Sequence, residues 1–286
     1  MAISVTQWRD DAQYFEFEGH RIAYFTIGRG APLLMVHGFP TSSWDWTPIW
    51  DKIDGNKHHL IAADMLGFGL SDKPRDGYSL MKQADLQEAF LAHLGITKFS
   101  AVVHDYGVSV GQELLARQAE GSGAEGLDRM VFLNGGIFPS QHRPLTIQRL
   151  GVSPLGPLVS RFLTRERFAR SLASTFGPHT KPTDAEIDAY WELICHNDGH
   201  RIMHRLLHYI ADRRAHEERL VTTLRQARNR IGLINGASDP VSGEHAFNRW
   251  VEYLPEANAY LLPDIGHYPQ VEAPDRTGQL ILEWLG

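Results

Sequence analysis

Short apolar segments alternate with helical segments along most of this chain, and that alternation constrains its fold more than any other sequence feature. The apolar runs that predict buried strands are 31–36, 59–63, 99–103 and 129–133. Between them, apolar residues recur with helical spacing, as Leu86, Phe90 and Leu94 do. Buried strands separated by helices are typical of a mostly parallel sheet with helices on both faces. The sequence therefore predicts an α/β fold.

The alternation stops at residue 138 and resumes near residue 228. The sequence pattern between these two points is almost entirely helical, and it includes a capping box at Thr183–Glu186 after Pro182. Further strands are expected at 230–235 and 259–262, with helices at 243–253 and 268–285. We therefore expect a core made of residues 1–137 and 226–286, and a helical lid, residues 138–225, over the carboxyl ends of the strands. Ligands of open α/β sheets bind at those ends.

Composition excludes several other classes of protein. The 286 residues are 43% hydrophobic and 22% charged, which is ordinary for a globular chain. The net charge of −6 argues against a nucleic-acid partner. No apolar run reaches the roughly 18 residues of a membrane span, and no polybasic run suggests a membrane surface. A single cysteine, Cys195, and an N-terminus without a signal pattern make a reducing cytoplasm the expected location.

The segment from Val102 to Ser109 carries the first sign of chemistry. An apolar strand runs directly into Asp105, and a helix begins immediately after it. This strand–turn–helix pattern is that of a nucleophile elbow, with Asp where hydrolases usually carry Ser. Gly107 permits the close backbone approach that such a turn requires. Asp is also a favoured helix N-cap, so Asp105 by itself leaves both interpretations open.

Two more polar residues favour the catalytic interpretation. Asp239 follows the strand expected at 230–235, and His267 follows the strand expected at 259–262. Both positions lie just past a strand end, at the same sheet edge as Asp105. The chain order of nucleophile, acid and histidine is the one found in α/β-hydrolases. We therefore predict a triad of Asp105, Asp239 and His267.

The motif His37-Gly38-Phe39-Pro40 follows an early strand. Its predicted role is one half of an oxyanion hole, in which the backbone N–H groups of Phe39 and Tyr106 point at one oxygen. Phe39–Pro40 is also a candidate cis peptide. Among the substrate-binding residues we expect His37 and Trp191.

These residues and their order resemble the α/β-hydrolase family with an aspartate nucleophile, which contains epoxide hydrolases and haloalkane dehalogenases. The resemblance covers essentially the whole chain and includes the loop Asp64–Pro74. It implies the α/β-hydrolase fold, with no cofactor and no metal. Three segments are most similar to the mesoderm-specific transcript branch of that family: His104–Gly107, Asn134–Pro139 and Asn197–Gly199.

An aspartate nucleophile selects the reaction. A carboxylate that attacks a saturated carbon becomes an ester, and water activated by His267 can attack that ester carbonyl. A serine that opened an epoxide would become an ether, which the histidine could not release. Asp239 would orient His267 and stabilise its imidazolium. The aspartate thus predicts attack on an epoxide or an alkyl halide, and argues against an esterase or lipase.

The leaving group distinguishes these two substrates. An epoxide oxygen needs an O–H donor, and the family resemblance implies lid tyrosines. Tyr209 has a family-like place late in the lid, and Tyr190 is the other lid tyrosine. A halide is commonly held by Trp and Asn side chains where this chain has Tyr106 and Phe39. We therefore predict an epoxide hydrolase acting on a small hydrophobic epoxide. The alternatives are a haloalkane or haloacid dehalogenase, and a hydrolase-fold binding or signalling protein with little turnover.

Other polar residues are weaker candidates. His200, His204 and His208 would share a helix face, but no third ligand type accompanies them at a metal-binding spacing, so we predict no metal site. Cys195 lies outside any elbow and is not expected to be catalytic. Asn134 ends a core strand where some family members carry the triad acid. As an amide it cannot serve as that acid, which favours Asp239.

Overall fold

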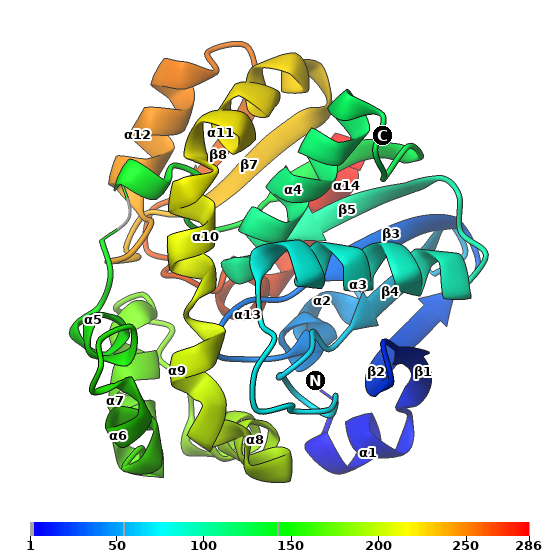
Figure 1. Cartoon of the computed structure of the whole chain (residues 1–286). Helices are drawn as coiled ribbons and strands as arrows, with labels where there is room; N and C mark the ends of the chain where they lie inside the picture. Colours follow the sequence, from blue (N-terminus) through cyan, green and yellow to red (C-terminus); the bar gives the residue numbers. More distant parts are fainter. Residues whose placement is uncertain (1–2, 54, 142, 286) are drawn as a thin grey trace.

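The computed structural model describes residues 3–53, 55–141 and 143–285. Within these residues eight strands form one sheet, in the order β1-β2-β4-β3-β5-β6-β7-β8 (Figure 1). The strands are β1 (Gln13–Phe17), β2 (His20–Gly28), β3 (Ala31–Val36), β4 (His58–Ala63), β5 (Phe99–Val103), β6 (Leu127–Phe132), β7 (Ile231–Gly236) and β8 (Asn258–Leu262).

Pairing is parallel from β4 through β3, β5, β6 and β7 to β8, and antiparallel between β1 and β2 and between β2 and β4. The central strands β3 and β5 are buried along most of their length, as expected for strands covered on both sides. The mostly parallel α/β sheet predicted from the apolar runs is therefore confirmed.

Helices cover both faces of the sheet. The helices of the first face pack around Phe90, Leu114, Leu224 and Trp250; they are α3 (Leu80–His93), α4 (Tyr106–Glu120), α11 (Glu217–Gln226) and α12 (Glu244–Tyr253). The helices of the second face pack around Trp8, Trp46, Trp50 and Ile281; they are α1 (Val5–Asp10), η1 (Ser43–Trp46), α2 (Thr47–Trp50), α13 (Pro269–Glu272) and α14 (Pro274–Leu285).

Two expected helices are interrupted, both at proline. The helix expected over 268–285 divides into α13 and α14 at Ala273, whose φ of −139° and ψ of 59° are not helical. Pro274 disfavours the helical conformation of the residue before it, which explains the break. The tryptophan-rich segment from Ser42 to Ile53 also predicts a helix, but it forms η1 followed by the short α2, where Pro48 lies in the first turn.

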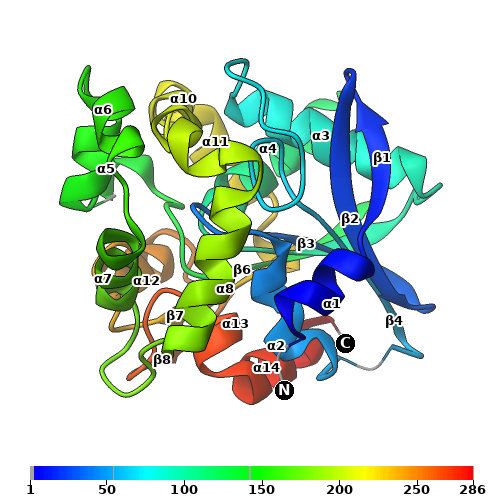
Figure 2. The same cartoon turned by 90° about the horizontal axis from the view of Figure 1, so that it is seen from below.

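A run of short helices lies between β6 and β7. Its helices are η2 (Pro139–Gln141), α5 (Thr146–Gly151), α6 (Gly156–Arg161), α7 (Arg165–Thr175), α8 (Asp184–Cys195), η3 (His196–Ile202), α9 (Met203–Leu206) and α10 (Tyr209–Ala215). We call residues 139–215, within the described parts of the chain, the helical insertion. Figures 1 and 2 both place α5 and α6 at an outer corner, away from the sheet. The predicted capping box begins α8, where Glu186 accepts the N–H of Thr183.

Helix α11 lies on the sheet side of the molecule, although the sequence assigns most of it to the lid. It packs against α4, and Arg219 forms ion pairs with Glu113 and Glu120 at 2.5 and 2.7 Å. Leu220 and Leu224 are fully buried beneath it. The short 3-10 turn η4 (Arg228–Arg230) then leads into β7. No helix among the described residues is both long and apolar enough to cross a membrane.

Candidate active site

Asp105 lies in a strained turn between β5 and α4. Its φ of 48° and ψ of −106° place it in a region that L-residues rarely adopt. The turn is held by the Asp105 N–H, which donates to the Asn134 carbonyl at 2.8 Å. A Cβ at Gly107 would lie 2.3 Å from the Val36 carbonyl oxygen, so only glycine fits there. The local sequence thus forces the Asp105 side chain out at the carboxyl end of the sheet.

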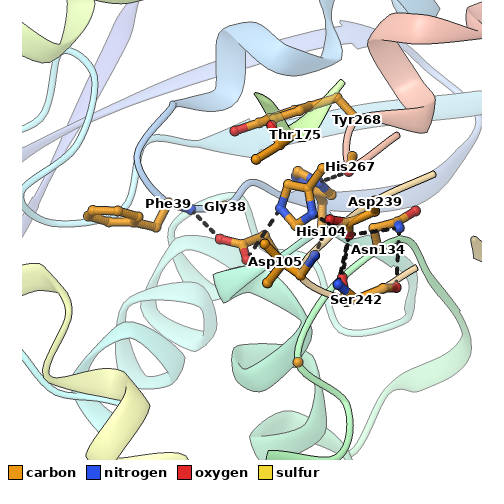
Figure 3. Close-up of polar contacts among 12 residues, drawn as sticks. Gly38, Phe39, His104, Asp105, Asn134, Thr175, Asp239, Ser242, His267 and Tyr268 are labelled. Carbon is orange, nitrogen blue, oxygen red and sulfur yellow. Dashed lines mark hydrogen bonds and ion pairs between the residues drawn. The ribbon is translucent and has the colours of Figure 1, made fainter. Parts of the chain in front are cut away.

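The Asp105 carboxylate contacts two other elements of the site (Figure 3). Its Oδ2 accepts the backbone N–H of Phe39 at 2.8 Å. Its Oδ1 lies 3.5 Å from Nε2 of His267. The loop after β3 can come this close because residue 38 is glycine, whose added Cβ would lie 2.5 Å from the Asp105 Cβ. One carboxylate oxygen is therefore anchored, and the other faces the histidine.

His267 follows β8 and is held at three points. Its Nδ1 lies 2.7 Å from Oδ2 of Asp239. Its backbone N–H donates to the carbonyl of Thr175 at 2.9 Å, and its own carbonyl lies 2.8 Å from Nε2 of His104. Thr175 belongs to α7, so the helical insertion helps to place the histidine.

The loop that carries His267 is fastened to the helical insertion a second time. One carboxylate oxygen of Glu272 accepts the N–H groups of Gly177 and Gly266, both at 2.8 Å, and the hydroxyl of Thr180. The other oxygen accepts the N–H of Tyr268 at 2.9 Å. Glu272 thereby joins the end of α7 to both sides of His267.

Asp239 is buried, and both of its carboxylate oxygens accept hydrogen bonds. Its Oδ1 accepts the N–H of Val241, and its Oδ2 accepts the N–H and hydroxyl of Ser242 at 3.1 and 2.6 Å. The Asn134 amide also donates to Oδ2 at 3.0 Å. Asn134 therefore supports the carboxylate that lies beside the histidine.

Charge and burial set the protonation of these groups. Burial by itself would raise the pKa of Asp105, but its hydrogen bond to His267, the charges of His267 and His104, and the Phe39 N–H lower that pKa to about 2. Burial opposes the charged form of His267, yet Asp239 and Asp105 raise its pKa well above the usual value. The same histidine lowers the pKa of Asp239 against the effect of burial. The two carboxylates therefore favour the charged form of the histidine that lies between them.

The predicted oxyanion-hole residues flank Asp105. Phe39 donates its N–H to Asp105, and the peptide bond Phe39–Pro40 is cis, as expected. Tyr106 is the first residue of α4, where N–H groups have no partner within the helix. His37 is fully buried behind this loop. Its Nδ1 lies 2.9 Å from the Gly38 carbonyl, and its Nε2 accepts the N–H of Met65 at 2.9 Å. These are contacts that support the loop.

A cavity opens above Asp105 and His267 and is walled by the core and the helical insertion. The core supplies Phe39, Pro40, Val241 and Tyr268. The residues from the insertion are mostly apolar; they are Leu145, Gln148, Gly151, Val159, Ser160, Leu163, Phe168, Ser171, Leu172, Thr175, Met203, His204 and Leu207. The arrangement suits a small, largely apolar ligand.

The structure does not bring the two candidate proton donors or the two candidate substrate-binding residues to the cavity wall. Tyr209 is buried with its ring stacked on Tyr106 at 3.9 Å. Tyr190 is buried edge-on against Trp44 at 5.0 Å. Trp191 packs near Phe168, with ring centroids 5.8 Å apart. These three side chains and His37 are absent from the cavity lining, whereas Asp105, His267 and Phe39 are part of it.

Several residues of the site were not found by sequence reasoning. Thr175 and His104 contact the backbone of His267 from distant parts of the chain, so no local pattern reveals them. Tyr268 lines the cavity, and its place directly after His267 was the signal that could have found it. Its ring stacks on Phe176 at 5.0 Å.

His204 is one of the three histidines that would share a helix face according to the sequence. Nδ1 of His204 lies 3.0 Å from the hydroxyl of Ser160, at the cavity wall. Within the described ranges, no group of three or more His, Cys, Asp or Glu side chains is arranged to hold a metal ion. Cys195 is a partly buried free thiol on α8.

Comparison with known proteins identifies the family. Residues 31–274 match the family model described as alpha/beta hydrolase fold. The mesoderm-specific transcript protein of Mus musculus is 39% identical over 281 residues, covering 93% of this chain and 83% of that protein. LipZ of Mycobacterium tuberculosis is 36% identical over 285 residues, covering 99% and 98%. A cis-3-alkyl-4-alkyloxetan-2-one decarboxylase of Shewanella oneidensis is 28% identical, covering 90% and 82%.

Solved structures share the fold at low sequence identity. The epoxide hydrolase CorEH has a TM-score of 0.78 at 20% identity, covering 96% of this chain and 98% of that chain. A loop variant of the haloalkane dehalogenase DbeA from Bradyrhizobium elkanii has a TM-score of 0.77 at 22% identity, covering 96% of both chains. The family match and the mesoderm-specific transcript relative together establish that this chain belongs to the α/β-hydrolase fold family.

Proposed function

We propose that this chain is a hydrolase that opens epoxides to vicinal diols through a covalent ester on Asp105. One observation carries the proposal. A carboxylate occupies the nucleophile elbow, with one oxygen on the Phe39 N–H at 2.8 Å and the other 3.5 Å from Nε2 of His267. A carboxylate there can make an ester that a nearby histidine can hydrolyse.

The first step is alkylation. Asp105, with its pKa lowered to about 2, is ionised at neutral pH and attacks with Oδ1, because Oδ2 is held by Phe39. A bond forms between this oxygen and an epoxide carbon, the ring C–O bond breaks, and the ring oxygen takes a proton from a donor. A phenol is a suitable donor; Tyr209 and Tyr190 are the proposed donors from the sequence, although neither lines the cavity. Tyr268 joins them as a candidate because it lines the cavity.

The second step is hydrolysis of the ester. Alkylation removes the negative charge of Asp105, which is one of the two charges that raise the pKa of His267. The imidazolium then gives its Nε2 proton to the phenolate that ring opening left, so Nε2 can take a proton from water as that water attacks the Asp105 carbonyl carbon. The Phe39 and Tyr106 N–H groups would stabilise the resulting oxyanion. Collapse expels the alkoxide, which takes the proton back from His267 and leaves as the diol.

A second substrate class is favoured by the cavity lining and by one relative. Tyr209 and Tyr190 lie outside the cavity wall, so a substrate whose leaving group needs no acid fits the site well. An oxetan-2-one is such a substrate, because its ring oxygen leaves as a carboxylate. Asp105 would form the ester at the ring carbon. Loss of CO₂ would then form a C=C bond as the C–O bond to Asp105 breaks, without water. The Shewanella oneidensis relative is named for decarboxylation of this ring.

Covalent trapping tests the proposal and separates the candidates. In His267→Gln the ester with an epoxide should form but not hydrolyse, so the intact-protein mass should rise by the mass of the epoxide. His200→Gln, a histidine of the helical insertion outside the cavity lining, is the matched control and should turn over without accumulating an adduct. A haloalkane substrate should leave an alkyl adduct and free halide.

Each outcome of this experiment has a clear meaning. Turnover of an oxetan-2-one that is unchanged in His267→Gln would favour decarboxylation, which needs no activated water. An unchanged mass with epoxides that the unsubstituted protein converts would refute the aspartyl ester. No turnover of any epoxide, haloalkane or oxetan-2-one would favour the binding or signalling alternative.

A further inference from the structure

The outer side of α5 and α6 exposes an unusual number of large apolar side chains. Seven such side chains are exposed among the described residues, and five of them lie within residues 150–162. They are Leu150, Val152, Leu155, Leu158 and Phe162, with exposed fractions of 42 to 56%. Single exposed apolar residues are ordinary, but a contiguous group marks an interaction surface. We call these five residues the apolar ridge.

The apolar ridge is the outer side of the cavity wall. Val159 and Leu163 line the cavity from the same segment that directs Leu158 and Phe162 to solvent. Figures 1 and 2 show α5 and α6 at a corner of the molecule, where they are free to meet a flat surface. One layer of short helices thus separates the catalytic cavity from whatever covers the ridge.

A hollow rich in arginine adjoins the ridge. Its lining residues are Arg75, Pro157, Arg161, Arg201, Ile202, His204 and Arg205. No acidic side chain is among them, and within the described residues no carboxylate lies at ion-pair distance from Arg75, Arg161 or Arg205. Arg201 pairs weakly with Asp198 at 3.5 Å. Pro157 and Arg161 lie one helical turn apart on α6, beside the row formed by Leu158 and Phe162, so hollow and ridge share one helix.

The charge of this region is opposite to that of the whole chain. Residues 143–175 contain six arginines and one glutamate, a net charge of +5, whereas the whole chain carries −6. An apolar row flanked by arginines matches the two layers of a lipid interface, since acyl chains accept the apolar side chains and phosphates accept the guanidinium groups. Anionic lipids add a surface potential that attracts each nearby arginine.

We propose that the apolar ridge and the arginine hollow together dock this protein on the surface of an anionic lipid bilayer. Leu155, Leu158 and Phe162 enter the boundary between headgroups and acyl chains. Arg75, Arg161 and Arg205 bind lipid phosphates. An apolar ligand dissolved in the bilayer then meets the cavity wall directly. The inference does not depend on which reaction Asp105 performs.

Co-sedimentation of the full chain with vesicles tests this proposal. One set of vesicles is phosphatidylcholine alone, and the other contains about one third phosphatidylserine. Binding should be clearly stronger to the second set and should weaken as salt is raised. Each of Arg161→Gln and Arg205→Gln should weaken partition by about fivefold, the effect of one arginine near an anionic surface. Leu158→Ser with Phe162→Ser should weaken it by at least tenfold, as expected for losing two partly inserted side chains.

Matched controls use exposed residues far from the ridge. Val251→Ser on α12, 43% exposed, and Arg276→Gln on α14, 50% exposed, should bind as the unsubstituted protein does. All these positions are on the surface, and unchanged thermal unfolding confirms that the variants are folded. Catalytic turnover of a water-soluble substrate provides a readout that docking should not alter.

Several results would overturn the proposal. These are equal partition to both vesicle sets, no partition at low salt, or losses as large in the control variants as in the ridge and hollow variants. A dimer that Leu158→Ser with Phe162→Ser dissociates, without any vesicle binding, would assign the ridge to a second copy of this chain. Binding of inorganic phosphate to the hollow without binding to vesicles would assign the arginines to a small anion instead.

Discussion

The substitution Asp105→Asn should lower the pKa of His267, because Asp105 is one of the two carboxylates that raise it. The two groups are 3.5 Å apart in a site that excludes most water. At an effective dielectric constant of about 20, two unit charges at this distance attract each other by about 4–5 kcal/mol. An attraction of this size is large compared with the 1.36 kcal/mol that changes a protonation equilibrium tenfold, so the loss of the Asp105 charge should move the His267 titration clearly to lower pH. Asn also keeps the shape of Asp and can donate a hydrogen bond to Nε2. This bond stabilises the neutral imidazole, so it too lowers the pKa of His267.

The assay is a histidine titration by two-dimensional nitrogen NMR, with the His267 signal identified by its absence in His267→Gln. The unsubstituted protein should keep His267 cationic through neutral pH, and Asp105→Asn should titrate at lower pH. Because a raised histidine pKa stabilises the fold below that pKa, the stability contributed by His267 should be lost at lower pH in the variant than in the unsubstituted protein.

Glu244→Gln removes an exposed carboxylate on α12 and should leave the titration unchanged. Equal His267 titrations in Asp105→Asn and in the unsubstituted protein would refute the reasoning. That result would mean that Asp239, 2.7 Å from Nδ1, alone sets the charge of the histidine and that alkylation does not release a base.

Four further predictions concern the same site. One turnover in heavy-oxygen water should label Asp105, detected in its peptide by mass spectrometry; label in the diol alone would contradict the ester. Tyr209→Phe should slow alkylation by roughly 10²–10⁴-fold in single-turnover kinetics if its hydroxyl is the acid, and an unchanged rate would show that it is not. Asn134→Ala removes the buried donor to Asp239 and the Gly236 carbonyl and should cost about 3 kcal/mol in urea unfolding. Gly107→Ala should cost at least as much, since its Cβ would lie 2.3 Å from a backbone oxygen.

The sheet and its polar edge could be predicted because the information is local. Each buried strand is a short apolar run, and the residue after its end lies at the carboxyl edge whatever the rest of the chain does. That rule alone predicts Asp105, Asp239 and His267 at one edge. The glycine pattern around the elbow is equally local, because it follows from a strand that turns at once into a helix.

The wall of the cavity could not be predicted in the same way. A helix repeats its apolar positions equally well against a sheet, a lid or another helix, so α11 carried the same pattern as the lid helices. Tyr209 and Tyr190 occupy suitable places in the order of the chain, yet tertiary packing directs their rings onto Tyr106 and Trp44. The arginine hollow is built from Arg75 and from residues of α6, η3 and α9, so no polybasic run exists in the sequence.

The fastening of the His267 loop to the helical insertion constrains how the cavity can open. Thr175 and Gly177 are hydrogen-bonded to His267 and to Glu272, respectively. A swing of α7 away from the core would break these bonds and release the histidine from its position beside Asp105. Ligand entry by that route would therefore displace His267 from Asp105. Movement of α5 and α6, whose residues make none of these hydrogen bonds, would leave the histidine in place.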